Sequence, residues 1–159
     1  MSELATVPLL LVEDNEEDAF ILQRAFKTLQ FSNPLFRVRD GEEAVQYLSG
    51  NGVYANRAEF PPPYLVLLDL KLPRMDGFQV LQFIRETPAL KHLFVIVLAT
   101  SDLNRDVARA YELGADSYLV KPGALSDVRE VIELLRKHWL MLDRIVEFRR
   151  QTAHFSPAH

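Results

Sequence analysis

The sequence predicts an α/β fold in which a doubly wound, five-stranded parallel sheet is covered by helices on both faces. Two observations carry this prediction. Five short apolar runs alternate along the chain with segments whose apolar residues recur at helical spacing. The third run, YLVLL, is continuously apolar, which is typical of a strand buried on both of its faces. Such an alternation of strands and helices indicates a parallel sheet.

Each expected strand is a short apolar run bounded by turn-forming or charged residues. Glu13 and Asp14 follow the first run, Asp40-Gly41 makes a turn after the second, and Asp69 follows the third directly. In chain order, we expect strands at residues 7–12, 34–38, 64–68, 94–98 and 117–120.

The expected helices each present an apolar face and begin or end at recognisable signals. Asn15 is placed to cap the first helix, and we interpret the acids at 16–18 as a solvated first turn that the helix dipole favours. Gly114 ends the fourth helix. Residues 49–63 contain three consecutive prolines, so we expect a surface excursion there. In chain order, we expect helices at residues 16–29, 42–48, 77 to near 88, around 107–113, and from 126 onward.

The composition is that of one ordinary globular domain, with 159 residues of which 48% are hydrophobic and 25% are charged. The formal net charge of −4 gives no electrostatic footprint for nucleic acid or for an anionic membrane. No apolar segment reaches the length of a membrane span. The absence of cysteine excludes disulfides and Cys-based zinc sites, and it fits a cytoplasmic location.

Acidic residues follow two of the expected strands. Glu13 and Asp14 come just past the first strand, and Asp69 ends the third. Open parallel sheets gather functional groups outside the carboxyl ends of their strands, at a topological switch point. If these two strands are neighbours, the three carboxylates converge, and they repel one another unless a cation lies among them. Carboxylate oxygens are ligands that suit Mg²⁺.

Lys121 ends the fifth strand and can supply a positive charge at the same edge. A carboxylate, a divalent metal and a lysine together can accept a phosphoryl group, because Asp69 attacks while the two cations offset charge on the phosphoryl oxygens. Each residue also has an ordinary alternative role: Asp14 as a helix cap, Asp69 as a turn residue and Lys121 as a surface charge. Their shared place at the ends of apolar strands favours the functional interpretation.

Three separated motifs resemble the receiver domain of bacterial two-component response regulators: VEDN at 12–15, LLDLKLPRMDG at 67–77 and SYLVKP at 117–122. The resemblance implies a flavodoxin-like fold with strand order 2-1-3-4-5. The resemblance covers about residues 7–138, so we expect a receiver domain over 1–138 and a C-terminal helix extension and tail over 139–159. The residues past 138 are too few for a separate effector domain. The chain is also similar to the stand-alone response regulators that serve bacterial phytochrome histidine kinases.

The resemblance implies a role for each acidic and basic residue singled out above. Asp69 is the expected phosphoacceptor, Asp14 a direct Mg²⁺ ligand, and Glu13 a residue that acts largely through water. The backbone carbonyl of Lys71 is a further expected metal ligand, and Lys121 is expected to pair with the phosphoryl group. The implied partner is a sensor histidine kinase.

The chain departs from the receiver pattern at one position. Receivers usually place Ser or Thr thirty positions past the phosphoacceptor, but that place is Ala99 here. Thr100 is the candidate for the missing hydroxyl contact, although neighbouring residues in a strand face opposite sides. The resemblance also makes Tyr118 the aromatic residue that moves on phosphorylation.

Two other functions compete with a phosphorylated receiver, which would not be an enzyme. An aspartate-nucleophile phosphatase uses similar chemistry, but such enzymes have a second acid two residues after the nucleophile, where this chain has Lys71. An unphosphorylated scaffold with a receiver fold is the other alternative. The presence of Glu13, Asp14, Asp69 and Lys121 together argues against it.

The last expected helix, 126–151, is apolar on more than one side. Trp139, Leu142 and Val146 continue its apolar stripe past residue 138. A helix that is apolar all round is buried on more than one side. We therefore expect a symmetric homodimer that packs these residues against their copies. The alternative is a helix that folds back over the edge of its own domain.

Overall fold

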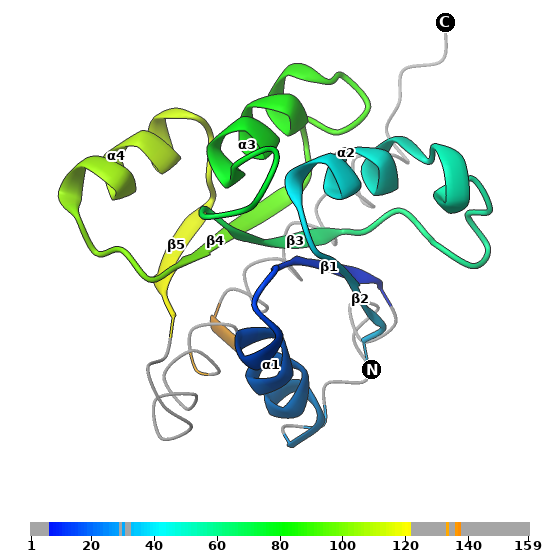
Figure 1. The fold of residues 1–159 in the computed structure, drawn as a ribbon, viewed down its shortest axis with the longest axis horizontal. Coiled ribbons are helices and arrows are strands. Elements are labelled where there is room, and N and C mark those ends of the chain that lie inside the picture. Colours follow the sequence, from blue (N-terminus) through cyan, green and yellow to red (C-terminus); the bar gives the residue numbers. More distant parts are fainter. Residues whose placement is uncertain (1–6, 29, 31–32, 122–132, 134–135, 138–159) are drawn as a thin grey trace, which may run out of the picture.

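The computed structural model describes residues 7–28, 30, 33–121, 133 and 136–137. Its strands form one five-stranded parallel sheet in the order β2-β1-β3-β4-β5, which confirms the predicted fold and strand order (Figure 1). The strands are β1 (Leu9–Val12), β2 (Leu35–Val38), β3 (Leu65–Asp69), β4 (Phe94–Ala99) and β5 (Ser117–Val120).

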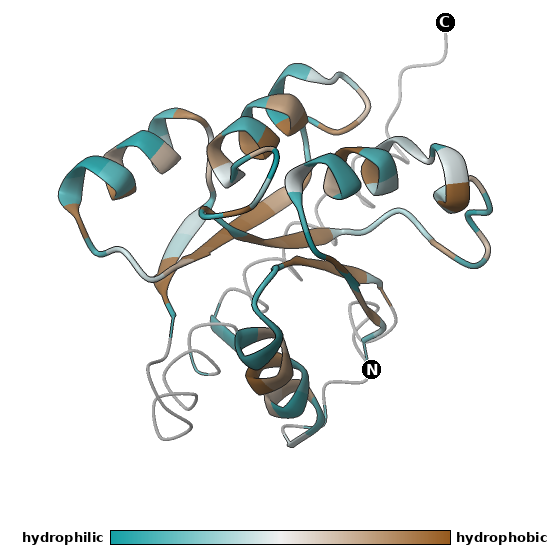
Figure 2. Cartoon of the chain, viewed as in Figure 1, coloured by the Kyte–Doolittle hydropathy of each residue, from teal (hydrophilic) through white to brown (hydrophobic). Residues whose placement is uncertain are grey.

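Helices cover both faces of this sheet (Figure 1). Among the described helices, α1 (Glu16–Thr28) packs on one face, and the other face carries α2 (Gly41–Ser49), α3 (Gly77–Glu86) and α4 (Asn104–Glu112). Successive strand residues point to opposite faces, so the strands contribute side chains to two hydrophobic cores, one on each face of the sheet. Figure 2 shows the sheet as an apolar layer between helices whose outer sides are polar. This double burial explains why the strands are apolar throughout.

Capping residues fix where three of the helices begin. Asn15 Oδ1 accepts a hydrogen bond from the backbone N–H of Asp18 at 2.9 Å, so its prediction as a cap of α1 is confirmed. Asp40 caps α2, and Asp76 forms a reciprocal capping box with Gln79 at the start of α3. The three capped helices follow β1, β2 and β3, so they begin on the side of the sheet where the carboxyl ends of these strands lie.

The connection between α2 and β3 is more ordered than the predicted surface excursion. It contains a 3-10 helix at Gly52–Tyr54, and the Tyr54 ring is buried 4.9 Å from that of Tyr47 and 5.1 Å from that of Phe60. Arg57 donates hydrogen bonds of 2.8, 3.3 and 3.1 Å to the carbonyl oxygens of Tyr47, Tyr54 and Phe60. This segment therefore packs onto the end of α2.

Gly77, the first residue of α3, lies against the backbone of the strand end that carries Asp69. A Cβ at this position would clash with the Asp69 carbonyl oxygen and lie 2.6 Å from Cα of Leu70. We expect Gly77→Ala to lower the free energy of unfolding by roughly 1–3 kcal/mol, because the added methyl displaces packed backbone. Urea denaturation measures this loss.

Gln82→Ala is the matched control, since Gln82 lies on the exposed side of the same helix. Its free energy of unfolding should stay within about 0.5 kcal/mol of the wild type. Equal stability of the two variants would contradict the close approach described at Gly77.

Candidate functional site

Three predicted carboxylates meet at the carboxyl edge of the sheet. β1 and β3 are neighbours, with Val12 paired to Leu68, so the residues that follow these strands lie side by side. One carboxylate oxygen from each of Glu13, Asp14 and Asp69 lies within 4.8 Å of the others. Glu13 and Asp69 are buried, whereas Asp14 is exposed. This set of oxygen donors fits a hard divalent cation such as Mg²⁺ or Mn²⁺.

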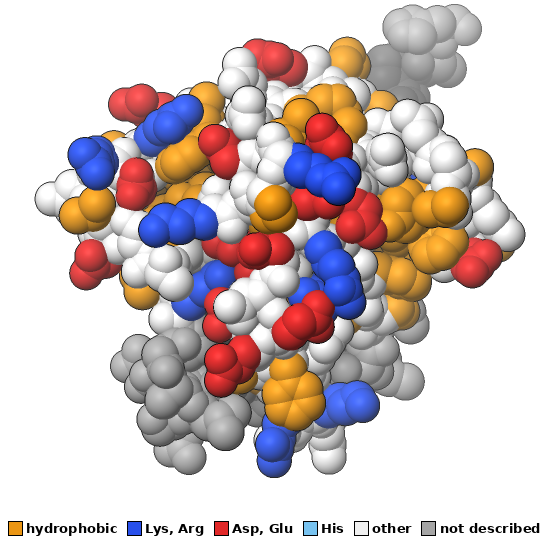
Figure 3. Space-filling view, viewed as in Figure 1, with side chains coloured by type: hydrophobic (Ala, Val, Ile, Leu, Met, Phe, Trp, Pro, Cys, Tyr) orange, Lys and Arg blue, Asp and Glu red, His pale blue; other side chains and the backbone are white. Residues whose placement is uncertain are grey.

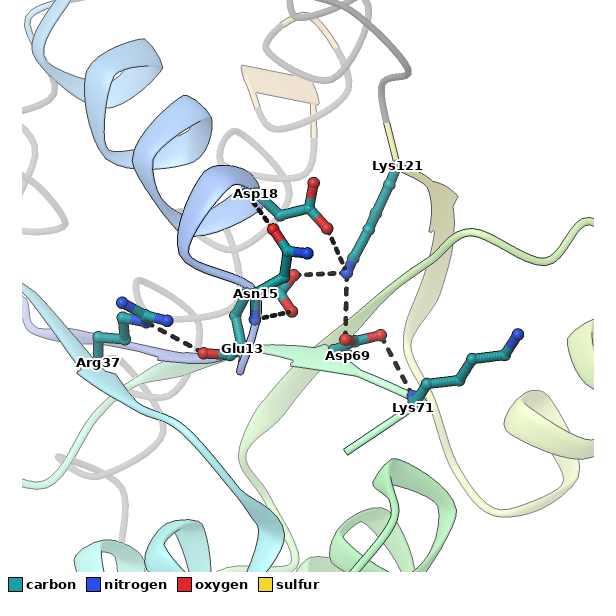
Figure 4. A network of polar contacts seen from close by, with 7 residues as sticks. All are labelled: Glu13, Asn15, Asp18, Arg37, Asp69, Lys71 and Lys121. Atoms are coloured by element: carbon teal, nitrogen blue, oxygen red, sulfur yellow. Dashed lines mark hydrogen bonds and ion pairs between the residues drawn. The ribbon is translucent and has the colours of Figure 1, made fainter. Parts of the chain in front are cut away.

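Lys121 places its ammonium among these carboxylates (Figure 4). Its Nζ lies 2.5 Å from Oε1 of Glu13, 3.0 Å from Oδ2 of Asp18 and 3.1 Å from Oδ2 of Asp69. The side chain is only 7% exposed. The backbone N–H of Lys121 donates to the carbonyl oxygen of Ala99 at 2.7 Å, which fixes the start of this side chain at the end of β4.

The pKa shifts in the site follow from burial and from these contacts. Burial raises the pKa of Glu13 to about 7, and a hydrogen bond with Asp69 acts in the same direction while Lys121 opposes it. Burial lowers the pKa of Lys121, but its contacts with Glu13, Asp69 and Asp18 outweigh that effect and raise the pKa. Lys121 therefore stays charged. Its single positive charge pairs with three carboxylates, and the Asp14 carboxylate lies in the same cluster, which leaves an excess of negative charge.

The interpretation of Asp18 as a solvated acid is wrong, because its carboxylate pairs with Lys121. The sequence did contain a signal for this contact. Asp18, Leu22 and Ala25 recur at spacings of four and three, and Leu22 and Ala25 are buried on the face of α1 that packs on the sheet. The same helical face therefore carries Asp18 to the edge of the sheet.

Lys71 contributes its backbone to the site. Its N–H donates to Oδ1 of Asp69 at 3.2 Å, while its ammonium points away from the cluster (Figure 4). The role predicted for its carbonyl oxygen as a metal ligand stays a prediction. Both Asp69 oxygens thus have a partner, Oδ1 in the backbone of Lys71 and Oδ2 in the ammonium of Lys121.

A cleft of about 520 Å³ opens beside Asp69, between the β3–α3 and β4–α4 connections. Ala99 is the last residue of β4 and Thr100 is the first residue after it, and both line this cleft. Because β4 ends at Ala99, the alternation of side chains along a strand does not extend to Thr100. Thr100 is therefore available to the cleft, and its contact with a phosphoryl group stays a prediction.

Tyr118 lies against the β4–α4 connection. Its hydroxyl donates to the carbonyl oxygen of Ser101 at 2.6 Å, and the Ser101 hydroxyl donates to Oδ2 of Asp106 at 2.6 Å. Burial raises the pKa of Tyr118, and the nearby charge of Asp106 adds to this shift. The movement predicted for Tyr118 on phosphorylation stays a prediction.

The residues predicted for a dimer interface, Trp139, Leu142 and Val146, lie outside the described residues. The homodimer and the domain boundary at residue 138 stay predictions.

In the part of the chain that the structure describes, no helix is both long enough and apolar enough to span a membrane. Figure 3 shows acidic and basic side chains interspersed over the middle of the visible face, between α1 and the α2–α4 layer.

Replacing the Lys121 ammonium tests the charge balance of the site. We expect Lys121→Met to lower the free energy of unfolding by about 3 kcal/mol in EDTA, because buried carboxylates lose their cationic partner. Saturating MgCl₂ should restore part of this loss, since a divalent cation supplies the missing charge. Urea denaturation with and without Mg²⁺ measures both effects.

Lys71→Met is the control for this experiment, since it removes the same charge from an exposed ammonium that points away from the cluster. Its effect should stay within about 0.5 kcal/mol. A loss in Lys121→Met that Mg²⁺ does not relieve would show that a metal cannot replace the ammonium.

Comparisons with known proteins identify the family. The family model of the response regulator receiver domain matches residues 9–133 of this sequence. The response regulator Rcp1 of Synechocystis sp. is 39% identical, over 88% of this chain and 95% of its own length. The crystal structure of its Mn²⁺-bound form has a TM-score of 0.76 and covers 84% of this chain and 94% of that one, at 39% identity. The phosphorylated cyanobacterial phytochrome response regulator RcpA has a TM-score of 0.77 at 37% identity, and the match covers 85% of this chain and 94% of that one. This chain belongs to the family of response regulator receiver domains.

Proposed function

We propose that this chain accepts a phosphoryl group on Asp69 from a sensor histidine kinase, in Mg²⁺-dependent phosphorelay signalling in the cytoplasm. One observation carries the proposal: the buried Asp69 carboxylate lies 3.1 Å from the Lys121 ammonium and within 4.8 Å of the carboxylates of Glu13 and Asp14. A nucleophilic carboxylate, a fixed ammonium and oxygen ligands for a cation are the groups that phosphoryl transfer requires.

The chemistry follows from the contacts of Asp69. One of its oxygens attacks the phosphorus of a phosphohistidine, so that a P–N bond breaks and an O–P bond forms, giving an aspartyl phosphate. The Lys71 N–H and the Lys121 ammonium hold the carboxylate in a fixed orientation for this attack. Lys121 also offsets the negative charge that the phosphoryl group brings. Glu13, Asp14 and Asp69 would hold Mg²⁺, which when bound neutralises charge on the phosphoryl oxygens.

Two relatives support the cation and the phosphoryl group in this role. Rcp1 has been solved with Mn²⁺, and RcpA, a phytochrome response regulator, has been solved phosphorylated. Each is similar to this chain over more than four fifths of its length. We therefore propose a phytochrome-type histidine kinase as the phosphodonor.

We further propose that the chain is a signalling switch and not a phosphatase. A phosphatase of the aspartate-nucleophile class needs a second acid near the phosphoryl group, and the residue at that position, Lys71, directs an ammonium away from Asp69 (Figure 4). A scaffold that is never phosphorylated would have no use for a buried lysine shared by three carboxylates, because burying charges is costly.

Asp69→Asn should abolish phosphorylation, since an amide is not a nucleophile, while circular dichroism shows the fold preserved. Incubation with acetyl phosphate and MgCl₂, followed by intact-mass spectrometry, should show one labile phosphoryl addition on the wild type and none on the variant. Asp76→Asn is the control: Asp76 lines the same cleft, and asparagine preserves its helix cap. If Asp69→Asn is phosphorylated as fully as the wild type, Asp69 is not the phosphoacceptor. Sustained release of phosphate by the wild type would indicate a phosphatase.

Thr100→Val tests whether the hydroxyl of Thr100, one residue after the usual position, contacts the phosphoryl group. We expect the lifetime of the aspartyl phosphate to change severalfold, which corresponds to a change of about 1 kcal/mol in the barrier to hydrolysis. Loss of the radiolabelled phosphoryl group over time measures this lifetime. Thr87→Val, at the far end of α3, removes a hydroxyl remote from the site and should leave the lifetime unchanged. If the aspartyl phosphate of Thr100→Val has the wild-type lifetime, Thr100 does not contact the phosphoryl group and is simply a polar residue before α4.

A further inference from the structure

Arg37, on β2, lies behind the turn that carries the first two carboxylates of the site. Its Nε donates to the carbonyl oxygen of Glu13 at 3.0 Å, and its Nη1 pairs with Oε2 of Glu16 at 2.9 Å. The side chain is only 12% exposed. Its guanidinium points toward the backbone carbonyl oxygen of Glu13 (Figure 4). One planar guanidinium therefore contacts the turn at Glu13, where β1 has ended, and at Glu16, where α1 begins. Asp14 lies between these two contacts.

Lys121 and Arg39 contact the side chains of Glu13 and Glu16, whereas the other contacts of the turn's backbone are short-range or come from the sheet backbone. The N–H of Glu13 donates to the carbonyl oxygen of Val38 at 3.0 Å, which extends the β1–β2 pairing. The N–H of Asn15 donates to Oε2 of Glu13 at 3.3 Å. Arg37 differs from these contacts, because it donates a side-chain hydrogen bond from the neighbouring strand to the peptide between Glu13 and Asp14.

We propose that Arg37 is a positioning residue for the cation site. By binding the Glu13 carbonyl and the Glu16 carboxylate together, it holds the turn so that the carboxylates of Glu13 and Asp14 face Asp69. This inference rests on the proposed Mg²⁺ dependence, because it concerns how the cation's ligands are arranged. Ligands held in place before binding lose less freedom when the cation binds, so support of this kind raises affinity.

If Arg37 acted through its charge alone, replacing it would have the opposite effect on cation affinity. A guanidinium close to an acidic site repels a divalent cation, so removing it would tighten binding if electrostatics were the only influence. Loss of a positioning contact instead weakens binding. The sign of the change in affinity therefore separates the two accounts.

Arg39 provides a matched control for Arg37. Its Nη1 pairs with the other oxygen of Glu16 at 2.9 Å, the same distance, but its side chain is 59% exposed and it makes no hydrogen bond with Glu13 among the described residues. Replacing Arg39 therefore removes an equal charge and a similar ion pair without releasing the Glu13 peptide.

The test is a titration of the metal-free full chain with MnCl₂, in which electron paramagnetic resonance counts the free Mn²⁺. We expect Arg37→Gln to weaken Mn²⁺ binding about tenfold or more, the range typical of residues that orient metal ligands. Arg37→Lys should recover part of the loss, because an ammonium can hold one of the two partners but not both. Arg39→Gln should bind within about twofold of the wild type or slightly more tightly.

Binding by Arg37→Gln that equals or exceeds that of Arg39→Gln overturns the inference. Circular dichroism and urea denaturation establish that each variant is folded. If Arg37→Gln does not fold, Arg37→Lys decides: weaker Mn²⁺ binding than the wild type supports the inference, and equal binding overturns it. A wild type that binds no Mn²⁺ overturns the proposed metal dependence as well, whereas normal wild-type binding with an unaffected Arg37→Gln overturns this inference alone.

Discussion

The burial of one ammonium among carboxylates is the interaction around which this site is arranged. In the sheet, β4 lies between β3 and β5, so a group that follows β5 must reach across the end of β4 to meet Asp69. Lys121 has the long, unbranched side chain that this span requires. The strand order therefore determines both that the carboxylates converge and that a lysine is suited to join them.

A single ammonium leaves the site short of positive charge. Glu13 and Asp69 are buried, and the Asp14 carboxylate lies within the same cluster without forming an ion pair among the described residues. Burial raises the pKa of Glu13 and the neighbouring Asp69 adds to this shift, so a proton on Glu13 is one way to relieve the imbalance. A divalent cation is the other. A phosphoryl group adds further negative charge, so a cation and phosphorylation should depend on each other.

The strands and the place of Asp69 could be predicted because both depend on local patterns, an apolar run and the residue that ends it. Asp18, Arg37 and Arg57 were not recognised, because their partners are identified only once the chain has folded. Asp18 meets a lysine 103 residues away, and Arg37 meets a carbonyl 24 residues away. Helical spacing could have placed Asp18 on the inner face of α1, but only the sheet order brings Lys121 to that face. Likewise, the prolines at 61–63 indicated a loop but not the burial of Tyr54 within it.

The end of β4, where this chain departs from the receiver pattern, has a physical consequence for the proposed switch. Ala99 packs in the core with Val95 and Val97 and has no hydroxyl to offer. Thr100 lies beyond the strand, on the connection whose next residue, Ser101, accepts the hydrogen bond from Tyr118. Under the proposed function, a phosphoryl contact at Thr100 would act on the β4–α4 connection and not on the strand end. The adjacent Ser101 carbonyl would then move with it, which links the state of Asp69 to Tyr118 through a single peptide unit.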